Sequence, residues 1–255
     1  MSWLYDSHIH LSDQEYKSDI LHIINAIEIL KLKACCVSMD HQTSVDTLNL
    51  SKKSQNILPF IGVHPEMAQK DALSVFEMIE QKNKEISGVG EIGLDRKYIT
   101  SEEEWYVQKK VFSNQLALAE KFKKPVSIHS RKTLGDVLEI ISSFNLTGVL
   151  LHWFDGNKRQ LKHVMDLGFF VSYGPVLLYA NDKQVLLSQT NTDQVLVETD
   201  GPVKFSHCFN YKTTQIQFLP SVVHCASEIL QISYKNMLKQ LEKNSQKFLY
   251  GCKNF

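Results

Sequence analysis

The stretch WLYDSHIH, residues 3–10, is a short and largely apolar run that ends in two histidines separated by one residue. Its length and its content of aromatic and aliphatic residues predict a β-strand over Trp3–His10. Because successive side chains of a strand point to opposite faces, His8 and His10 share a face and can hold one metal ion. An isolated His-x-His pair is more often a chance occurrence, so the rest of the chain has to decide between these interpretations.

Seven further apolar runs of similar length follow the first one. The predicted strands are Trp3–His10, Ala34–Met39, Leu58–Val63, Ser87–Leu94, Pro125–His129, Gly148–His152, Phe169–Tyr173 and Val195–Thr199. The runs are nearly continuous in apolar residues, which is typical of parallel strands covered on both faces. Eight such strands alternating with helices predict the α/β class and a TIM-like (β/α)8 barrel.

Amphipathic segments with apolar residues at helical spacing separate the strands. The predicted helices are Tyr16–Leu32, Ser44–Asn56, Ala72–Lys84, Glu102–Phe122, Leu134–Phe144, Lys158–Leu167 and Asp182–Gln189, with additional C-terminal helices over Thr214–Ile232 and Tyr234–Tyr250. Ser101 followed by three glutamates is typical of a helix start, which explains that acidic run without a metal. We expect a single hydrolase barrel domain over residues 1–255, because a barrel of this class commonly has this length and no linker interrupts the pattern.

The composition argues against a strongly basic nucleic-acid-binding protein, a disulfide-rich protein and a membrane protein. Twenty-eight basic and 28 acidic residues give a formal net charge of zero, so any nucleic-acid binding has to be local. The five cysteines are odd in number and lack Cys-x-x-Cys spacing, which argues against a disulfide framework or a zinc ribbon. The chain shows neither a signal-peptide pattern nor a long apolar run, so we expect a cytoplasmic protein without membrane contact.

Polar residues lie at or just after the ends of the predicted strands, and Glu91 lies within the fourth. The set comprises His8, His10, His64, Glu91, His129, His152 and Asp200. In a barrel of this type the carboxyl ends of the strands form one rim, and that rim carries the active site. One histidine at a strand end is more often structural, but five converging with two carboxylates predict a metal site.

Six short motifs occur in order along the chain. They are DSHIHL at 6–11, GVHPE at 62–66, GEIGLD at 90–95, PVSIHSR at 125–131, LHWFDG at 151–156 and ETDGP at 198–202. Together they resemble the successive motifs of the TatD-type metal-dependent deoxyribonucleases. The resemblance covers nearly the whole chain and implies a barrel of the amidohydrolase superfamily, two divalent metal ions, and hydrolysis of DNA phosphodiester bonds.

The resemblance also implies a role for each residue of the rim. His8, His10 and Asp200 would hold one cation, His129 and His152 the other, and Glu91 would bridge the two. Two cations roughly 3.5–4 Å apart can stabilise both the attacking and the leaving oxygen of an in-line displacement. Catalysis would involve Glu91, Asp200 as proton acceptor, and His64. Imidazole and carboxylate ligands admit zinc, manganese and magnesium alike, so the metal identity stays open.

Three residues near these ligands are candidates for further roles, and two of them have an alternative interpretation. His64 would contact the substrate, or it would order the turn from Gly62 to Pro65. Arg131 is a candidate phosphate clamp because its planar fork matches two phosphate oxygens, and the alternative is an ordinary salt bridge at the rim. Asp95 would orient a metal-bound histidine, as such sites usually require.

The sequence departs from the family pattern beside the predicted active site. The chain reads VKFSHCFNYK after Pro202, where many relatives have a basic, glycine-containing stretch, and Trp153 stands where the family usually has cysteine. The aromatic and basic residues of this stretch could stack on a nucleotide, or the aromatics could pack the segment internally. The residues concerned are Lys204, Phe205, Phe209, Tyr211 and Lys212.

We therefore expect a nuclease that acts on DNA, most readily on single-stranded ends, which it binds weakly. The expected type is a 3′–5′ exonuclease, although the sequence does not fix the polarity. A relative that hydrolyses a small amide, lactone or phosphoester with the same metals is the alternative. Glu91 in place of a bridging lysine favours the nuclease. A binding or scaffold protein without turnover is disfavoured because none of the predicted ligands is replaced. No obligate protein partner is expected.

Overall fold

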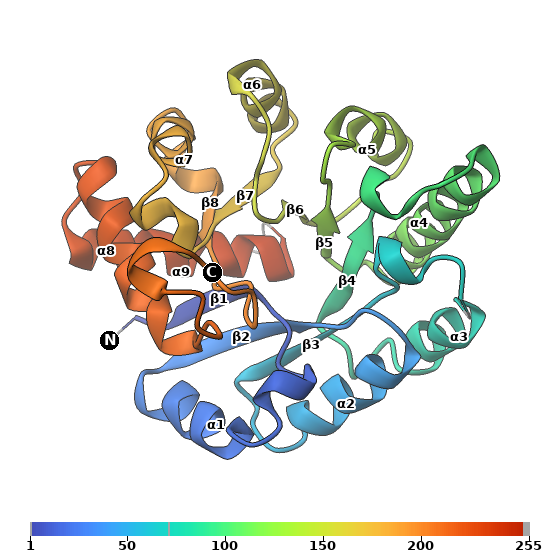
Figure 1. Ribbon diagram of the computed structural model, residues 1–255, viewed down its shortest axis with the longest axis horizontal. Coiled ribbons are helices and arrows are strands. Elements are labelled where there is room, and N and C mark those ends of the chain that lie inside the picture. The colour runs from blue at the N-terminus through green and yellow to red at the C-terminus, as the bar shows by residue number, and fades with distance from the viewer. Residues whose placement is uncertain (1, 71, 252–255) are drawn as a thin grey trace.

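The sheet is a barrel of eight parallel strands, each paired with the next one along the chain (Figure 1). The computed structural model describes residues 2–70 and 72–251. The strands are β1 (Leu4–Ile9), β2 (Leu32–Val37), β3 (Ile57–Ile61), β4 (Gly88–Gly93), β5 (Val126–His129), β6 (Val149–Leu151), β7 (Phe170–Tyr173) and β8 (Val195–Val197). The predicted TIM-like barrel is confirmed, because the strand order follows the sequence from β1 to β8.

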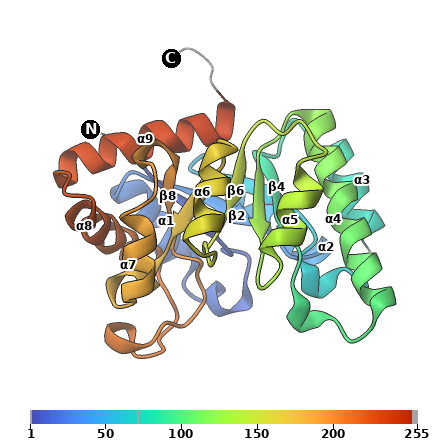
Figure 2. The same ribbon diagram turned by 90° about the horizontal axis from the view of Figure 1, so that it is seen from above.

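Helices cover the outside of the barrel and connect successive strands (Figures 1 and 2). They are α1 (Ile20–Ile29), α2 (His41–Ser51), α3 (Leu73–Gln81), α4 (Glu102–Phe122), α5 (Leu134–Ile141), α6 (Lys158–Asp166) and α7 (Asn181–Leu187), followed by α8 (Leu219–Ile229) and α9 (Tyr234–Tyr250). The predicted C-terminal helices are therefore present. No helix within the described residues is both long and apolar enough to span a lipid bilayer.

Some helix boundaries differ from the predicted ones for local reasons. Helix α2 begins at His41 and not at Ser44, because the Asp40 side chain accepts a hydrogen bond from Thr43 N and caps the helix earlier. Helix α8 begins at Leu219, with Pro220 in its first turn, and a 3-10 turn occupies the preceding residues. Ser101 caps α4 as predicted. Four cysteines are free thiols, and Cys252 lies outside the described residues.

Side chains help to close the seam between β1 and β8. Buried Asp6 accepts hydrogen bonds from the backbone N of Thr199 at 3.0 Å and from its hydroxyl at 2.5 Å. Ser7 Oγ donates to Val197 O at 2.9 Å. Burial, partly offset by the hydrogen bonds from Thr199, raises the pKa of Asp6 to about 7. The first and last strands are therefore joined by hydrogen bonds between buried polar groups.

Helix α9 closes one end of the barrel, and the segment 201–218 lies at the opposite end (Figure 2). The Phe248 ring of α9 packs against Phe60 and Phe170, with ring centroids 6.1 Å and 5.9 Å apart. These rings fill the barrel interior together with neighbouring apolar residues. The end of the barrel with α9 is thus a packed apolar core. Polar side chains can therefore gather only at the opposite end.

Two buried glutamines of α4 hold the backbone where β3 and β4 end. Gln115 Oε1 accepts from Val63 N at 2.7 Å, and its Nε2 donates to Val63 O at 3.2 Å. Gln108 Oε1 accepts from Asp95 N at 2.9 Å, and its Nε2 donates to Pro65 O and Asp95 O. The two loops that carry His64 and Asp95 are therefore fixed by an outer helix.

We predict that Gln115→Leu lowers the free energy of unfolding by about 2–4 kcal/mol, because two buried backbone groups of Val63 lose their partners. The measurement is urea unfolding followed by circular dichroism. Gln81→Leu, at an exposed end of α3, is the matched control and should change stability by less than about 0.5 kcal/mol. Equal midpoints for the two variants would show that Gln115 does not hold this loop.

Candidate metal centre

The barrel brings all seven predicted rim residues together at the carboxyl ends of the strands. His8 lies in β1 and Glu91 in β4, His129 ends β5, and His10, His64, His152 and Asp200 follow β1, β3, β6 and β8. All of them are buried or partly buried. His10 and His129 are the most accessible of the five histidines, with 13% and 18% of their side chains exposed. A ligand from solvent would therefore meet these two rings first.

Glu91 lies at the centre of the group and is 2% exposed. Its backbone N donates to Ser38 O at 2.9 Å, which ties the end of β4 to the end of β2. Burial opposes ionisation, yet the surrounding imidazoles, above all His64 and His152, hold the pKa of Glu91 well below its usual range. Glu91 is therefore a buried carboxylate, and its two oxygens face different neighbours.

The first group of donors surrounds Glu91 Oε2. His8 Nε2 and His10 Nε2 lie 3.5 Å and 3.3 Å from this oxygen and 3.3 Å from each other. Asp200 Oδ1 is 3.6 Å from each of the two nitrogens. Ligands of a tetrahedral ion with bonds of roughly 2.1 Å are about 3.4 Å apart, so this spacing fits one divalent cation.

Backbone hydrogen bonds connect the segments that carry these donors across the seam between β1 and β8. Asp200 N donates to His8 O at 3.0 Å, and His10 N donates to Gly201 O at 2.8 Å. On the far side of its ring, His8 Nδ1 is hydrogen-bonded to Ser127 Oγ at 2.8 Å. Strand β5 thus orients the His8 ring, and β8 sets the distance between His8 and Asp200.

The second group of donors surrounds Glu91 Oε1. His129 Nδ1 and His152 Nε2 lie 2.9 Å and 2.8 Å from this oxygen. On the outer side of His129, Nε2 is 2.9 Å from Asp95 Oδ2. With a cation bound, a carboxylate there would accept the Nε2 proton and leave the Nδ1 lone pair for the ion, as in many metal-bound histidines. Imidazole nitrogens and a carboxylate are suitable donors for a divalent cation.

His64 differs from the other rings in its tautomer. Its Nε2 is 3.6 Å from Glu91 Oε1, close enough to belong to a metal-binding group. Its Nδ1, however, accepts from the backbone N of Glu66 at 3.2 Å. A neutral imidazole that accepts at one nitrogen carries its proton on the other. His64 therefore presents an N–H to the site, whereas a metal ligand needs a lone pair.

The pKa values of four of the five histidines divide them into two pairs. Burial opposes protonation of His10 and His129, but hydrogen bonds to Asp200 and Glu91 raise the pKa of His10 to about 10, and those to Asp95 and Glu91 raise that of His129 to about 9. Burial lowers the pKa of His8 and of His64 to about 4. One positively charged ring thus stands on each side of Glu91, at positions where cations would also be favoured.

Arg131 lies at the rim beside these residues and is exposed. Within residues 2–70 and 72–251 it forms no ion pair, so the salt-bridge alternative finds no support. Burial opposes ionisation of Asp95, but the hydrogen bond with His129 and, more weakly, the charge of Arg131 lower its pKa. The guanidinium is therefore near the site and available to an anion.

The aromatic residues of the segment after Pro202 pack against one another. Phe205 is 4% exposed and lies against Trp153 and Phe209, with ring centroids 5.3 Å and 5.9 Å apart. Lys204 pairs with Glu15 at 2.8 Å. The packing alternative therefore describes Phe205 and Phe209 better than a stacking platform does.

Sequence reasoning missed several polar residues behind the donors. Ser127 hydrogen-bonds His8, Ser38 ties β2 to β4, and buried Glu198 lies behind His152 with Oε1 3.9 Å from Nδ1. Glu198 is part of the ETDGP motif but received no role. A polar residue inside an apolar strand is the only signal that sequence offers for such positions.

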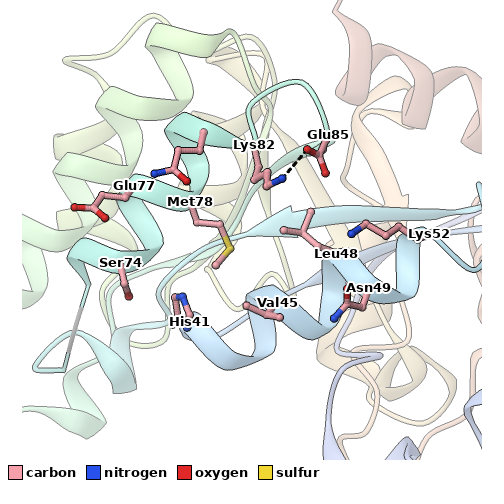
Figure 3. A pocket seen from close by; sticks show the side chains of 11 residues that line it. His41, Val45, Leu48, Asn49, Lys52, Ser74, Glu77, Met78, Lys82 and Glu85 are labelled. Atoms are coloured by element: carbon pink, nitrogen blue, oxygen red, sulfur yellow. Dashed lines mark hydrogen bonds and ion pairs between the residues drawn. The ribbon is translucent and has the colours of Figure 1, made fainter.

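A cavity of about 350 Å³ lies elsewhere, between α2 and α3 (Figure 3). Its lining includes His41, Val45, Met78 and the paired Lys82 and Glu85, whose Nζ and Oε1 are 2.9 Å apart. None of the rim residues contributes to it.

We predict that Asp95→Ala weakens binding of Zn²⁺ about 10–100-fold, because His129 loses the acceptor that fixes its tautomer. Calorimetric titration of the metal-free protein measures this. Asp182→Ala, at the exposed start of α7, is the control and should bind as the parent does. Unchanged affinity in Asp95→Ala, with an unchanged melting temperature, would contradict the assignment.

Known proteins with similar sequences cover most of this chain. An uncharacterized metal-dependent hydrolase of Bacillus subtilis, YabD, is 25% identical over 253 residues, which cover 96% of this chain and 98% of YabD. The human deoxyribonuclease TATDN3 is 26% identical over 213 residues, which cover 78% of each chain.

Solved structures show the same fold. The TatD homologue YJJV of Escherichia coli superposes with a TM-score of 0.88 at 21% identity, covering 96% of this chain and 97% of YJJV. A TatD family hydrolase of Entamoeba histolytica gives a TM-score of 0.85 at 17% identity, with 98% and 99% coverage. The family model described as TatD related DNase matches residues 5–250, and the chain belongs to this family.

Proposed function

We propose that this protein is a deoxyribonuclease that hydrolyses phosphodiester bonds with two divalent cations. The observation that carries the proposal is the division of the donors by Glu91. Its Oε2 faces His8 and His10, and its Oε1 faces His129 and His152. A single carboxylate with a separate set of imidazoles at each oxygen is the arrangement that would bridge two ions.

Each donor set would hold one ion. His8, His10 and Asp200 would bind the first, His129 and His152 the second, and Glu91 both. When bound, the cations would supply positive charge to the phosphate oxygens and make a nearby water more acidic. The ligand nitrogens are preset for this, because Ser127 and Asp95 engage the outer nitrogens of His8 and His129.

Asp200 and His64 would act on the reacting groups. Burial opposes ionisation of Asp200, but His10 and His8 hold its pKa below the usual range, so it is a carboxylate able to accept the proton of the attacking water. The water oxygen forms a bond to phosphorus while the bond from phosphorus to the leaving oxygen breaks. His64, with its proton on Nε2, would donate a hydrogen bond to a phosphate oxygen as negative charge develops there.

We infer that the substrate is held at a strand end. With a formal net charge of zero, the chain has no excess of positive charge for a long run of phosphates. Arg131 is exposed next to His129, the more accessible side of the second donor set. The human relative TATDN3 is named a deoxyribonuclease, which supports DNA as the substrate. Binding should therefore be weak and confined to a few nucleotides.

A small amide, lactone or phosphoester is the alternative substrate. Within the described residues, no lysine forms an ion pair or hydrogen bond with the two donor sets, and the side chain that faces both sets is Glu91. No observation specifically favours a small substrate. Hydantoin-like and lactone substrates tested beside a labelled single-stranded oligonucleotide distinguish the two.

We predict that the purified protein binds up to two divalent ions per chain and that exhaustive chelation abolishes hydrolysis. Glu91→Gln should reduce both rate and metal content more than loss of any one histidine, because Glu91 faces both donor sets. Metal analysis after gel filtration, with rates on a single-stranded oligonucleotide, measures this. A variant that keeps near-normal rate and metal content would refute the bridging role.

We predict that linear single strands are cleaved much faster than circular ones. The logarithmic salt slope should correspond to roughly two or three phosphates at about −0.7 each. Arg131→Ala should raise KM, reduce the slope by about 0.7 and leave metal content unchanged. Lys110→Ala, exposed on the outside of α4, is the control and should change neither quantity.

Rates across a salt series on both substrates decide these points. Equal rates on circles and linear strands would remove the strand-end model. An unchanged slope in Arg131→Ala would remove Arg131 from the phosphate site while leaving the two-cation proposal untouched.

A further inference from the structure

His152 has a buried ring nitrogen without a partner. Its Nε2 is 2.8 Å from Glu91 Oε1, but its Nδ1 forms no hydrogen bond, and it is the one buried side-chain polar atom in the described part of the chain in this condition. Buried polar atoms are nearly always paired, so such an exception calls for an explanation. The other outer nitrogens, those of His8 and His129, do have partners, Ser127 and Asp95.

Glu198 lies directly behind this nitrogen. Its Oε1 is 3.9 Å from His152 Nδ1, just beyond hydrogen-bond distance, and its side chain is fully buried. Oε1 accepts from the backbone N of Trp153 at 2.8 Å, and Oε2 is 2.5 Å from Ser172 Oγ. The carboxyl group is therefore anchored at both oxygens and cannot turn away from the ring.

The proton on His152 has to change place when the ring binds a cation. A neutral imidazole carries one proton. While Nε2 donates to Glu91, Nδ1 needs no acceptor. Once Nε2 offers its lone pair to a cation, the proton has to be on Nδ1, and a metal-bound histidine normally donates that proton to a carboxylate or carbonyl.

Binding of a cation would displace the His152 ring from Glu91. A cation between Nε2 and Glu91 Oε1 needs the two atoms farther apart than 2.8 Å, because two bonds of roughly 2.1 Å at a tetrahedral angle span about 3.4 Å. The His8 ring stacks on His152 with centroids 3.7 Å apart and planes within 8°, so a displacement of His152 that keeps this stacking lies within the plane of its ring. Retreat from Glu91 carries Nδ1 toward Glu198.

We propose that Glu198 is a positioning residue that accepts the Nδ1 proton of His152 and so directs the Nε2 lone pair to the second cation. This inference rests on the two-cation function proposed above and deepens it. Glu198 touches neither substrate nor cation in this role. It acts on His152 as Asp95 acts on His129.

The role does not depend on the charge of Glu198. Burial and the nearby Asp200 raise the pKa of this carboxyl well above its usual range. A neutral carboxyl with its proton on Oε2, facing Ser172, still leaves Oε1 as an acceptor. A glutamine with its carbonyl oxygen at the same place would do the same, which provides a conservative variant.

The first experiment is calorimetric titration of the metal-free protein with Zn²⁺. Glu198→Ala should weaken the second binding event about 10–100-fold and leave the first unchanged, whereas Glu198→Gln should bind both ions as the parent does. Tyr173→Phe is the control, because it removes a buried hydroxyl of β7 that is bonded to Thr190, without touching His152. Unchanged affinity in Glu198→Ala, or equal losses in the alanine and glutamine variants, would overturn the proposal.

The second experiment is nuclear magnetic resonance of ¹⁵N-labelled protein loaded with Zn²⁺. A hydrogen-bonded Nδ1–H resonance of His152, protected from solvent exchange, should appear in the parent and in Glu198→Gln. Its absence from the parent would overturn the proposal even if Glu198→Ala does not fold. A parent protein that binds two Zn²⁺ ions and shows this resonance but cleaves no DNA would refute the proposed function and leave the role of Glu198 standing.

Discussion

The buried charge of Glu91 is the constraint on which the rest of the site depends. An ionised carboxylate that is 2% exposed is costly unless positive or hydrogen-bonding groups surround it. Five imidazoles from four other strands or strand ends meet this need, and they can do so only where the parallel strands of a barrel end together. The same convergence creates two donor sets. The imidazoles that stabilise the buried Glu91 carboxylate are therefore also the groups on which the proposed chemistry depends.

The outer nitrogen of each ring distinguishes the histidines, although their residue type is the same. His129 donates its outer proton to Asp95, which would leave the Nδ1 lone pair for a cation. His64 accepts a backbone proton from Glu66 at its outer nitrogen, so it offers an N–H instead. A proposed metal ligand and a proposed phosphate contact therefore differ only in what lies behind the ring, one layer away from the reacting groups.

The rim is held from outside the site as much as from within it. Asp6 joins β1 to β8 beneath His8 and Asp200, and buried glutamines of α4 fix the loops after β3 and β4. These contacts use desolvated polar groups, which are weak sources of net stability but define one geometry, because any other arrangement would leave them unpaired. The fold thus combines apolar packing at the α9 end with specific polar contacts at the rim.

The sequence by itself determined the class of fold, the strand order and the seven residues of the rim, because apolar periodicity and parallel topology follow from local pattern and chain order. It did not determine helix starts such as that of α2 at His41, or the burial of Phe205, which depend on caps and packing. Only the tertiary structure decided which Glu91 oxygen faces which ring, that His64 presents an N–H, and that Glu198 stands behind His152. The physical reason is that histidine tautomers and the distances between donor atoms are set by neighbouring residues that are far apart in the chain. The spacing of residues along the sequence does not specify these neighbours.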